Sequence, residues 1–254
     1  SSRYRGSCWP RIDRNQLFCC PVLNLPQSHL RSATQWKPKH MYWKKSFTPD
    51  WVLFTDENLV VVNKPAGLRS VPDGYDPSLP HLRSVLEPIL GRLWMVHRLD
   101  KETSGLMVLA RDANSHRELN RQFREHEPIK HYLAQVAPQP SWNEISLEVP
   151  LKVNADRNHR TRVDFENGKP ARTDFLVRRR EENWAELVCT LHSGVTHQIR
   201  AHLYYLGLGI LGDPLYQPPK FKLTPKPEVD RMMLHATELT FTHPKTGAVM
   251  HFSD

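Results

Sequence analysis

The chain has 254 residues, 39% of them hydrophobic, and a formal net charge of +8. This length and apolar content are enough for a sizeable buried core, in one large domain or two small ones. The longest apolar runs, such as residues 59–62 and 106–110, fall far short of the roughly 20 residues that a membrane-spanning helix needs, so we expect no membrane span.

Positive charge is concentrated near the start of the chain. Residues 1–49 contain nine Lys or Arg and one acidic residue, Asp13, whereas the remainder has 26 basic and 26 acidic residues. The body of the protein is therefore formally neutral, and its overall charge does not indicate that the folded domain binds RNA. Evidence for a nucleic-acid partner has to come from local patches and from chemistry.

The cysteines and histidines do not form a metal-binding pattern. The four cysteines have no CxxC spacing, and three of them lie in the first twenty residues, which favours neither a zinc site nor a disulfide framework. His192, His197 and His202 are five residues apart, a step that turns them onto different faces of a helix. We predict no metal site and a reducing compartment.

Residues 1–48 lack sustained hydrophobic periodicity and are rich in Arg, Ser, Pro and Trp. We interpret them as a basic, poorly ordered extension that precedes a folded domain over residues 49–254. A transit segment, a processing boundary and a basic tail that touches RNA phosphates are the alternatives for this extension. A cytoplasmic location is expected, or a mitochondrion or plastid if the extension is a transit segment.

Downstream of residue 50, short strands outnumber helices. Strands are predicted at residues 51–54, 59–63, 106–110, 131–136, 171–177, 185–191 and 239–242, and helices at 79–90, 114–126 and 197–206. The two kinds of element do not alternate regularly. We therefore predict an α+β fold with a mixed, largely antiparallel sheet rather than a doubly wound parallel one.

The polar segment 97–105, His-Arg-Leu-Asp-Lys-Glu-Thr-Ser-Gly, lies directly before the apolar strand at residues 106–110. A loop held by a buried strand can place a carboxylate, here Asp100, at a defined geometry. Most loop aspartates, however, only bind nearby backbone amides, here those of Thr103 and Ser104. On spacing alone, this turn interpretation is favoured.

The surrounding residues reverse that preference. His97-Arg98-Leu99-Asp100, followed by Thr103-Ser104-Gly105 and an aliphatic strand, closely resembles the catalytic motif of the RluA family of pseudouridine synthases. Further resemblances lie at residues 63–67, 121–132, 168–171, 196–202, 212–216 and 234–236, so that the likeness covers residues 50–254. It implies the pseudouridine synthase fold, with helices and loops around a central sheet and a catalytic cleft.

Members of this family convert uridine in RNA into its C-glycoside isomer: the bond from ribose C1′ to N1 breaks, the base rotates, and C5 bonds to C1′. The resemblance implies that no cofactor or metal is needed, and that Asp100 either attacks C1′ or removes a ribose proton. Arg200 would pair with Asp100, unless it is a surface arginine of an amphipathic helix. Tyr132 would take the proton from C5 or stack on the target ring, unless it is a core aromatic residue.

Other residues are expected to contact RNA. By resemblance, Arg98 fills the gap that the flipped uridine leaves in its stack; a phosphate contact or a salt bridge with Glu102 is the alternative. Val195 stands where the family usually has an arginine, which removes one expected cleft or phosphate contact. The remaining residues expected at the RNA interface are His97, Lys130, Arg160 and Arg162.

The small helical RNA-binding module of many relatives has no counterpart in residues 1–48. We therefore expect the catalytic domain alone to recognise a compact RNA stem-loop, with no obligatory protein partner. The first expected target is the tRNA anticodon arm, and the second is large-subunit rRNA.

An idle RNA-binding protein of the same fold would not need Asp100, Tyr132 and Arg200 together. A nucleoside or glycoside hydrolase would normally need a second carboxylate, for which Glu102 is the near candidate.

Overall fold

The computed structural model describes Trp43 and residues 47–254. The predicted extension therefore lies outside the described residues, except for Trp43, Phe47 and Thr48. The backbone N–H of Trp43 donates to the carbonyl oxygen of Ala66 at 2.8 Å, and the rings of Trp43 and Phe47 each pack on Trp51 at a centroid distance of 5.5 Å. Trp43 and Phe47 thus contact the folded domain.

The strands, in chain order, are β1 (Val52–Thr55), β2 (Leu59–Lys64), β3 (Trp94–Met95), β4 (Ser104–Ala110), β5 (Ile129–Ala137), β6 (Glu144–Glu148), β7 (Leu151–Lys152), β8 (Arg162–Val163), β9 (Arg172–Arg180), β10 (Ala185–Leu191), β11 (Gly209–Ile210), β12 (Leu234–Thr242) and β13 (Val249–Ser253). The helices are α1 (Leu82–Leu90), α2 (Ala113–Arg124), α3 (Gln198–Tyr205) and α4 (Pro219–Leu223), and a 3-10 helix spans Pro49–Trp51.

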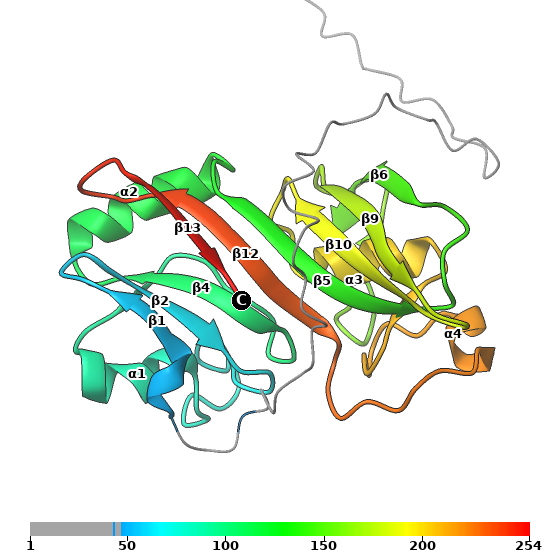
Figure 1. The fold of residues 1–254 in the computed structure, drawn as a ribbon, viewed down its shortest axis with the longest axis horizontal. Coiled ribbons are helices and arrows are strands. Elements are labelled where there is room, and N and C mark those ends of the chain that lie inside the picture. The colour runs from blue at the N-terminus through cyan, green and yellow to red at the C-terminus, as the bar shows by residue number, and fades with distance from the viewer. Residues whose placement is uncertain (1–42, 44–46) are drawn as a thin grey trace, which may run out of the picture. The chain divides into compact units, whose positions relative to one another are not determined.

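One large sheet has the strand order β1-β2-β4-β12-β5-β10-β9-β6 (Figure 1). The short strands β3, β13 and β11 add to β4, β12 and β5, while β7 and β8 form a separate pair. Among the described strands of the large sheet, neighbours are antiparallel except β4 and β12, which pair in parallel at Ser104 with His235 and at Gly105 with Ala236. The predicted mixed, largely antiparallel sheet of an α+β fold is confirmed.

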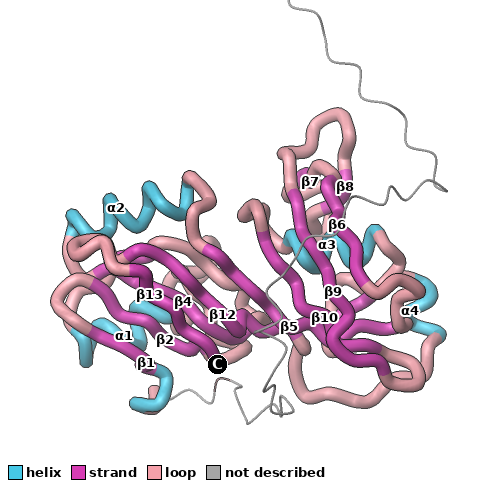
Figure 2. Tube along the Cα trace, turned by 45° about the horizontal axis from the view of Figure 1, so that its top comes forward, coloured by secondary structure: helices cyan, strands magenta, loops and turns pink. Residues whose placement is uncertain are grey.

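The long strands β5 and β12 divide this sheet into two halves (Figure 2). Helices α1 and α2 accompany β1, β2 and β4 on one side, and α3 and α4 accompany β6, β9 and β10 on the other (Figure 1). Helix α2 buries Leu119 and packs Phe123 against an apolar core from β2, β4 and β12, and a second cluster forms around Ala201 of α3 and Tyr216. Each half therefore has its own apolar cluster.

Gly105 determines how closely β4 approaches β12. Its φ of 117° is one that side chains rarely adopt, and a Cβ atom there would lie 2.3 Å from the backbone oxygen of Ala236. Glycine is thus required where the loop at residues 97–103 enters the sheet. The C-terminal end of the loop that carries Asp100 is therefore held in place where it joins β4.

The predicted helices and strands are present with shifted ends. Helix α1 begins at Leu82 rather than at residue 79, because His81 and Ser84 form a reciprocal cap in front of it. Helix α2 begins after Asp112, whose carboxylate accepts the backbone N–H groups of the first turn. The prediction missed β3, β6, β7, β8, β11, β13 and α4, which are short elements of two to five residues each.

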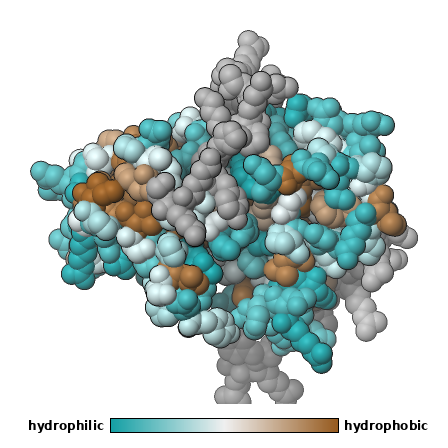
Figure 3. All heavy atoms as spheres, turned by 90° about the horizontal axis from the view of Figure 1, so that it is seen from below, coloured by the Kyte–Doolittle hydropathy of each residue, from teal (hydrophilic) through white to brown (hydrophobic). Residues whose placement is uncertain are grey.

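Hydrophilic side chains cover most of the face that Figure 3 presents, and hydrophobic side chains lie on it in separate patches. Individual exposed apolar residues, such as Tyr75 and Leu223, are common on folded proteins and need no special role. In the part of the chain that the structure describes, no helix is both long and apolar enough to cross a membrane.

Candidate active site

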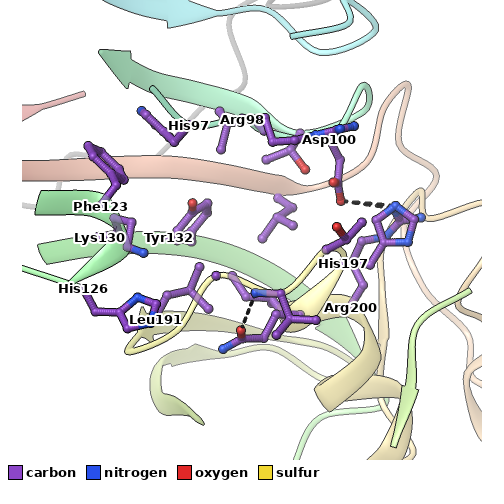
Figure 4. A pocket seen from close by; sticks show the side chains of 18 of the residues that line it. His97, Arg98, Asp100, Phe123, His126, Lys130, Tyr132, Leu191, His197 and Arg200 are labelled. Atoms are coloured by element: carbon purple, nitrogen blue, oxygen red, sulfur yellow. Dashed lines mark hydrogen bonds and ion pairs between the residues drawn. The ribbon is translucent and has the colours of Figure 1, made fainter. Parts of the chain in front are cut away.

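A cleft of about 430 Å³ draws its lining from both halves of the sheet and from α2 and α3. Its described lining includes one carboxylate, Asp100, and four Lys or Arg side chains. In Figure 4, one end of the cleft holds Asp100, His197 and Arg200, the other end holds Phe123, His126 and Lys130, and Tyr132 lies between them. The expected residues brought together here are His97, Arg98, Asp100, Lys130, Tyr132 and Arg200.

Arg160 and Arg162 are not among the residues that line this cleft. Their Nε atoms lie 2.7 and 2.9 Å from one carboxylate oxygen of Asp156, in the segment between β7 and β8. The guanidinium of Arg160 also lies over the ring of Tyr204, 5.7 Å from its centroid. The structure therefore gives both arginines a carboxylate partner and does not bring them to Asp100.

The side chain of Asp100 faces the cleft instead of closing a turn. The backbone N–H of Thr103 donates to the backbone carbonyl of Asp100 at 3.1 Å, which leaves the carboxylate free for other partners. Its Oδ2 atom lies 3.3 Å from Nη1 of Arg200 and 3.7 Å from Nε2 of His197. With 17% of its side chain exposed, Asp100 is reachable from the cleft while a cation holds one of its oxygens.

Arg200 is 5% exposed, so it is not a surface arginine of an amphipathic helix. Asp213 binds it bidentately, with 2.7 Å from Nε to Oδ2 and 2.8 Å from Nη2 to Oδ1. Burial disfavours the charged guanidinium and by itself lowers the pKa of Arg200. The hydrogen bonds to Asp213 and the negative charges of Asp213 and Asp100 have the larger effect, so the pKa of Arg200 is raised. The role of Asp213 was not predicted, although this acidic residue lies in residues 212–216, one of the segments that resemble the family.

A buried glutamine fixes the start of α3, and with it the direction of Arg200. The side-chain oxygen of Gln198 accepts from Ser193 Oγ at 2.8 Å and from the N–H of Val195 at 3.1 Å. Its amide nitrogen donates to β9, to the carbonyl of Arg172 at 2.9 Å and to Oγ1 of Thr173 at 3.0 Å. The first residue of α3 is therefore hydrogen-bonded both to β9 and to the loop that precedes the helix.

His197 precedes α3 in a left-handed conformation, with a φ of 57°. Its Nδ1 atom lies 3.1 Å from the hydroxyl of Tyr216, and its Nε2 atom faces Asp100. Burial and the charge of Arg200 lower the pKa of His197, against the attraction of Asp100. The sequence analysis considered His197 only as a metal ligand and so missed its place beside the carboxylate.

Two buried side chains hold the Asp100 loop from behind. Ser70 accepts the N–H of Leu99 at 3.1 Å and donates to the carbonyl of Leu99 at 2.7 Å. The ammonium of Lys64, which is fully buried, donates to three backbone carbonyls, including that of Lys101 at 3.3 Å. Because Leu99 and Lys101 flank Asp100, these bonds fix its backbone.

Behind the loop, the buried environment also acts on the charge of Lys64. Burial lowers its pKa to about 7, although Asp100 and Glu102 attract the ammonium. The three carbonyl acceptors favour the protonated form by hydrogen bonding. The cost of burying this amine is therefore met in part by backbone oxygens that belong to the loop and to the segment after β2.

A chain of polar groups continues behind the loop. Nε2–H of His235 donates to the Asp254 carboxylate at 2.8 Å, which leaves Nδ1 of the neutral ring to accept from the Ser104 hydroxyl at 2.7 Å. Arg231 donates to Oγ of the same serine at 3.0 Å. Asn63 donates to the same oxygen of Asp254 at 2.5 Å. Ser104 and His235 are both fully buried, so this set cannot attack a substrate and instead joins β2, β4 and β12.

His97 joins the cleft wall to β4. Its Nε2 atom accepts the backbone N–H of Val108 at 3.1 Å, and its ring stacks on Phe123 with centroids 4.4 Å apart and planes at 12°. Burial and the nearby charge of Lys130 lower the pKa of His97 to about 3. The ring is therefore neutral, and one of its nitrogens is already occupied within the protein.

Tyr132 projects from β5 into the middle of the cleft and is 8% exposed. Burial, and then the charge of Asp100, raises the pKa of its phenol. Tyr132 is therefore an uncharged phenol in this structure. It combines the two alternatives of the sequence analysis, because it is buried like a core aromatic residue and also lines the cleft.

Arg98 and Lys130 line the cleft, and their side chains have no hydrogen bond or ion pair with any residue that the structure describes. Glu102, the alternative partner of Arg98, lies 3.3 Å from Lys101 instead. Burial lowers the pKa of Lys130. Val195, at the position where the family usually has an arginine, also lines the cleft.

Comparisons with known proteins agree with this architecture. Residues 58–205 match the family described as RNA pseudouridylate synthase. The dual-specificity RNA pseudouridine synthase RluA of Salmonella typhi is 39% identical over 203 residues, covering 79% of this chain and 90% of that protein. The protein of the same name from Haemophilus influenzae is 39% identical over 203 residues, covering 80% and 91%.

Solved structures give the same result for the fold. Human RNA Pseudouridylate Synthase Domain Containing 1 is similar with a TM-score of 0.67 at 25% identity, covering 80% of this chain and 82% of that chain. Human RNA Pseudouridylate Synthase Domain Containing 4 is similar with a TM-score of 0.63 at 25% identity, covering 80% and 87%. The predicted pseudouridine synthase fold is confirmed.

Proposed function

This chain belongs to the RNA pseudouridylate synthase family, and from that premise we propose that Asp100 is the carboxylate with which it isomerises uridine to pseudouridine in RNA. The position of Asp100 carries the proposal. It is the one carboxylate in the described lining of the cleft, and one of its oxygens lies 3.3 Å from Arg200.

A carboxylate at this position has two routes to the product. It can attack ribose C1′ as the bond to N1 breaks, or it can remove a ribose proton and leave a glycal. In either route the detached uracil turns and C5 bonds to C1′. In the first route the bond from Asp100 to C1′ breaks at that step, and in the second route Asp100 returns its proton to the ribose. The proton on C5 then leaves, and N1 takes up a proton. Arg200 orients the carboxylate throughout, and Asp213 in turn orients Arg200.

Tyr132 serves the same reaction from the middle of the cleft. Stacking on the target ring needs no ionisation, and it suits a phenol whose pKa is raised. Removal of the C5 proton would need the hydroxyl oxygen. We expect Tyr132→Phe to bind RNA like the wild type and to slow the step after glycosidic cleavage by more than about 100-fold. An unchanged rate would leave stacking as the role of Tyr132.

The RNA target that we propose is a uridine in a structured stem-loop, in the tRNA anticodon arm first and in large-subunit rRNA second. Relatives that are 39% identical bear the name dual-specificity RNA pseudouridine synthase, which supports more than one RNA substrate. Loop bases are also cheaper to flip than bases in a duplex.

The proposed RNA contacts follow the positions of the basic residues. Arg98 is exposed beside Asp100, so we assign it to the gap that the flipped uridine leaves. His97 and Lys130 form part of the cleft wall. Arg160, in the segment between β7 and β8, and Arg162, the first residue of β8, would contact phosphates farther along the RNA.

Tritium release from RNA labelled at uridine C5 tests this function directly. Bulk tRNA and rRNA are incubated with the wild-type protein, with Asp100→Asn and with Asp100→Ala, and circular dichroism establishes that each variant is folded. We expect release by the wild type alone, while both variants still bind RNA. Full activity of Asp100→Asn would overturn the assignment, and free uracil among the products would indicate a hydrolase instead.

A further inference from the structure

The end of the cleft away from Asp100 contains a lysine in an unusual position. Lys130 and Tyr132 are two residues apart on β5 and therefore lie on the same face of the sheet, at roughly 7 Å from each other. Both line the cleft, and Lys130 lies at the end where Figure 4 places Phe123 and His126. A uridine held between Asp100 and Tyr132 would thus have Lys130 beyond its ring.

The charges in this cleft are unbalanced. The described lining has four cations, Arg98, Arg124, Lys130 and Arg200, and one carboxylate, Asp100. Arg200 pairs with Asp100 and with Asp213, so the positive charge of the other three cations is not balanced by a carboxylate of the lining. Arg124 lies 3.8 Å from Glu125 and is 74% exposed, so this contact screens it weakly. A negatively charged ligand would therefore be favoured along the rest of the lining.

Lys130 has the least compensation of these cations. It is partly buried, and it has no acceptor or counter-ion among the residues that the structure describes. Burial of an ammonium without a partner costs free energy, and the lowered pKa of Lys130 reflects this cost. Lys64, a fully buried lysine near the site, has three carbonyl acceptors. Lys130 differs from it because no acceptor among the described residues binds its ammonium.

We propose that the Lys130 end of the cleft is a binding subsite for a phosphodiester of the RNA strand, at a linkage next to the target uridine. Lys130 is the main ligand, and Arg124, at the end of α2, adds a second positive charge at the mouth. The proposal rests on the proposed function, because it takes the Asp100 end as the place of the uridine. The alternative is a lysine whose ammonium only reaches water.

The first test compares Lys130→Met and Lys130→Arg with the wild type on the stem-loop in which the wild type forms pseudouridine. We expect Lys130→Met to weaken RNA binding about tenfold and Lys130→Arg to retain most of it. The slope of log K against log salt should become shallower by about 0.7 to 0.9 in Lys130→Met, as for one lost phosphate contact. Lys222→Met, on an exposed residue outside the cleft lining, is the matched control and should bind like the wild type.

A second test locates the phosphate. Each linkage around the target uridine is replaced in turn by a neutral methylphosphonate, and the affinity of each RNA is measured with the wild type and with Lys130→Met. At one flanking linkage, we expect the methylphosphonate to lower the RNA affinity of the wild type about tenfold and to leave the RNA affinity of Lys130→Met unchanged. Equal losses in both proteins at every linkage would overturn the subsite.

The outcomes separate this proposal from the function on which it rests. If the wild type isomerises the stem-loop and Lys130→Met has the same affinity and salt slope, the subsite is wrong and the function stands. If the wild type isomerises no RNA, the proposed function fails and the subsite fails with it. Binding of inorganic phosphate that competes with RNA only at high concentration and is the same in Lys130→Met would also count against the subsite.

Discussion

The two sides of the Asp100 loop treat polar groups in opposite ways. Behind the loop, Ser70 and Lys64 bond to the backbone on either side of Asp100. A series of hydrogen bonds there also links β2, β4 and β12. On the cleft side, Arg98 and Lys130 have no partner among the described residues. Most polar side chains behind the loop bond to other groups of the protein, although the buried Oδ1 atom of Asn63 has no hydrogen-bond partner in the described part of the chain, whereas the cleft side has unused donors.

The protein therefore fixes geometry behind the loop and leaves room for a ligand in front of it. A buried hydrogen-bond network holds the backbone of a catalytic group at a defined place. Unpartnered donors in a cleft can only be satisfied by water or by the substrate. Lys64 is fully buried with three carbonyl acceptors, whereas Lys130 is half-buried and its ammonium has no partner among the described residues, so the two lysines serve different tasks.

The largest effect is expected at Asp213, which binds the buried guanidinium of Arg200. Asp213→Ala leaves the buried guanidinium of Arg200 without its bidentate partner, so we expect a loss of about 3–5 kcal/mol in the free energy of unfolding, measured by urea denaturation. Glu181→Ala, which removes an exposed partner of Arg179, should cost less than about 1 kcal/mol. Equal effects of the two substitutions would contradict this account.

A smaller effect is expected at Ser70. Ser70→Ala leaves the N–H and the carbonyl of Leu99 buried without their partner, which should cost about 1–3 kcal/mol of stability. Because Leu99 precedes Asp100, kcat should also fall by about tenfold while KM changes little. Ser78→Ala, at an exposed serine, is the control for both measurements. An unchanged kcat would mean that Ser70 does not position the carboxylate.

The charge of Lys64 predicts a pH dependence. Its pKa is about 7 in the folded protein against an ordinary 10.5, so the unfolded chain binds more protons between these values and stability rises with pH across that window. Relative to Lys64→Met, the free energy of unfolding of the wild type should therefore increase by up to about 1.4 kcal/mol per pH unit. Parallel pH profiles for the two proteins would show that Lys64 does not titrate in this range.

The smallest effect tests the cleft side. Val195→Arg restores the usual family residue and adds a cation to the lining, so we expect RNA affinity to rise about threefold, with a steeper salt dependence. Filter binding at several salt concentrations measures both. Val249→Arg, at an exposed position on β13, controls for added net charge. An equal gain in both variants would assign the effect to overall charge.

The main features of the fold and of the cleft could be predicted from the sequence because they depend on contiguous signals. Hydrophobic runs mark β2, β4 and β10, and the 97–105 segment identifies Asp100 by its neighbours. The closeness of Arg200 to Asp100 was predicted by family resemblance, and the distance of 3.3 Å agrees with it. The catalytic roles themselves stay predictions.

Other features could not be predicted from the sequence, for reasons that differ from one feature to the next. The bond from Asn63 to Asp254 spans 191 positions, and no local pattern signals it. The short strands β7 and β8 contain two residues each, too few for a period to show. Arg160 and Arg162 look like free RNA contacts in the sequence, but Asp156 pairs with both of them.

The parallel pairing of β4 with β12 also bears on when the site is assembled during protein synthesis. Ser104 and His235 are 131 residues apart in the chain, so the loop of Asp100 emerges from the ribosome long before the strand that supports it. Arg200 and Asp213 also follow Asp100 by a hundred residues or more. Such long-range contacts form late in folding. We therefore expect nascent chains that end before β12 to contain the catalytic motif and yet to lack activity.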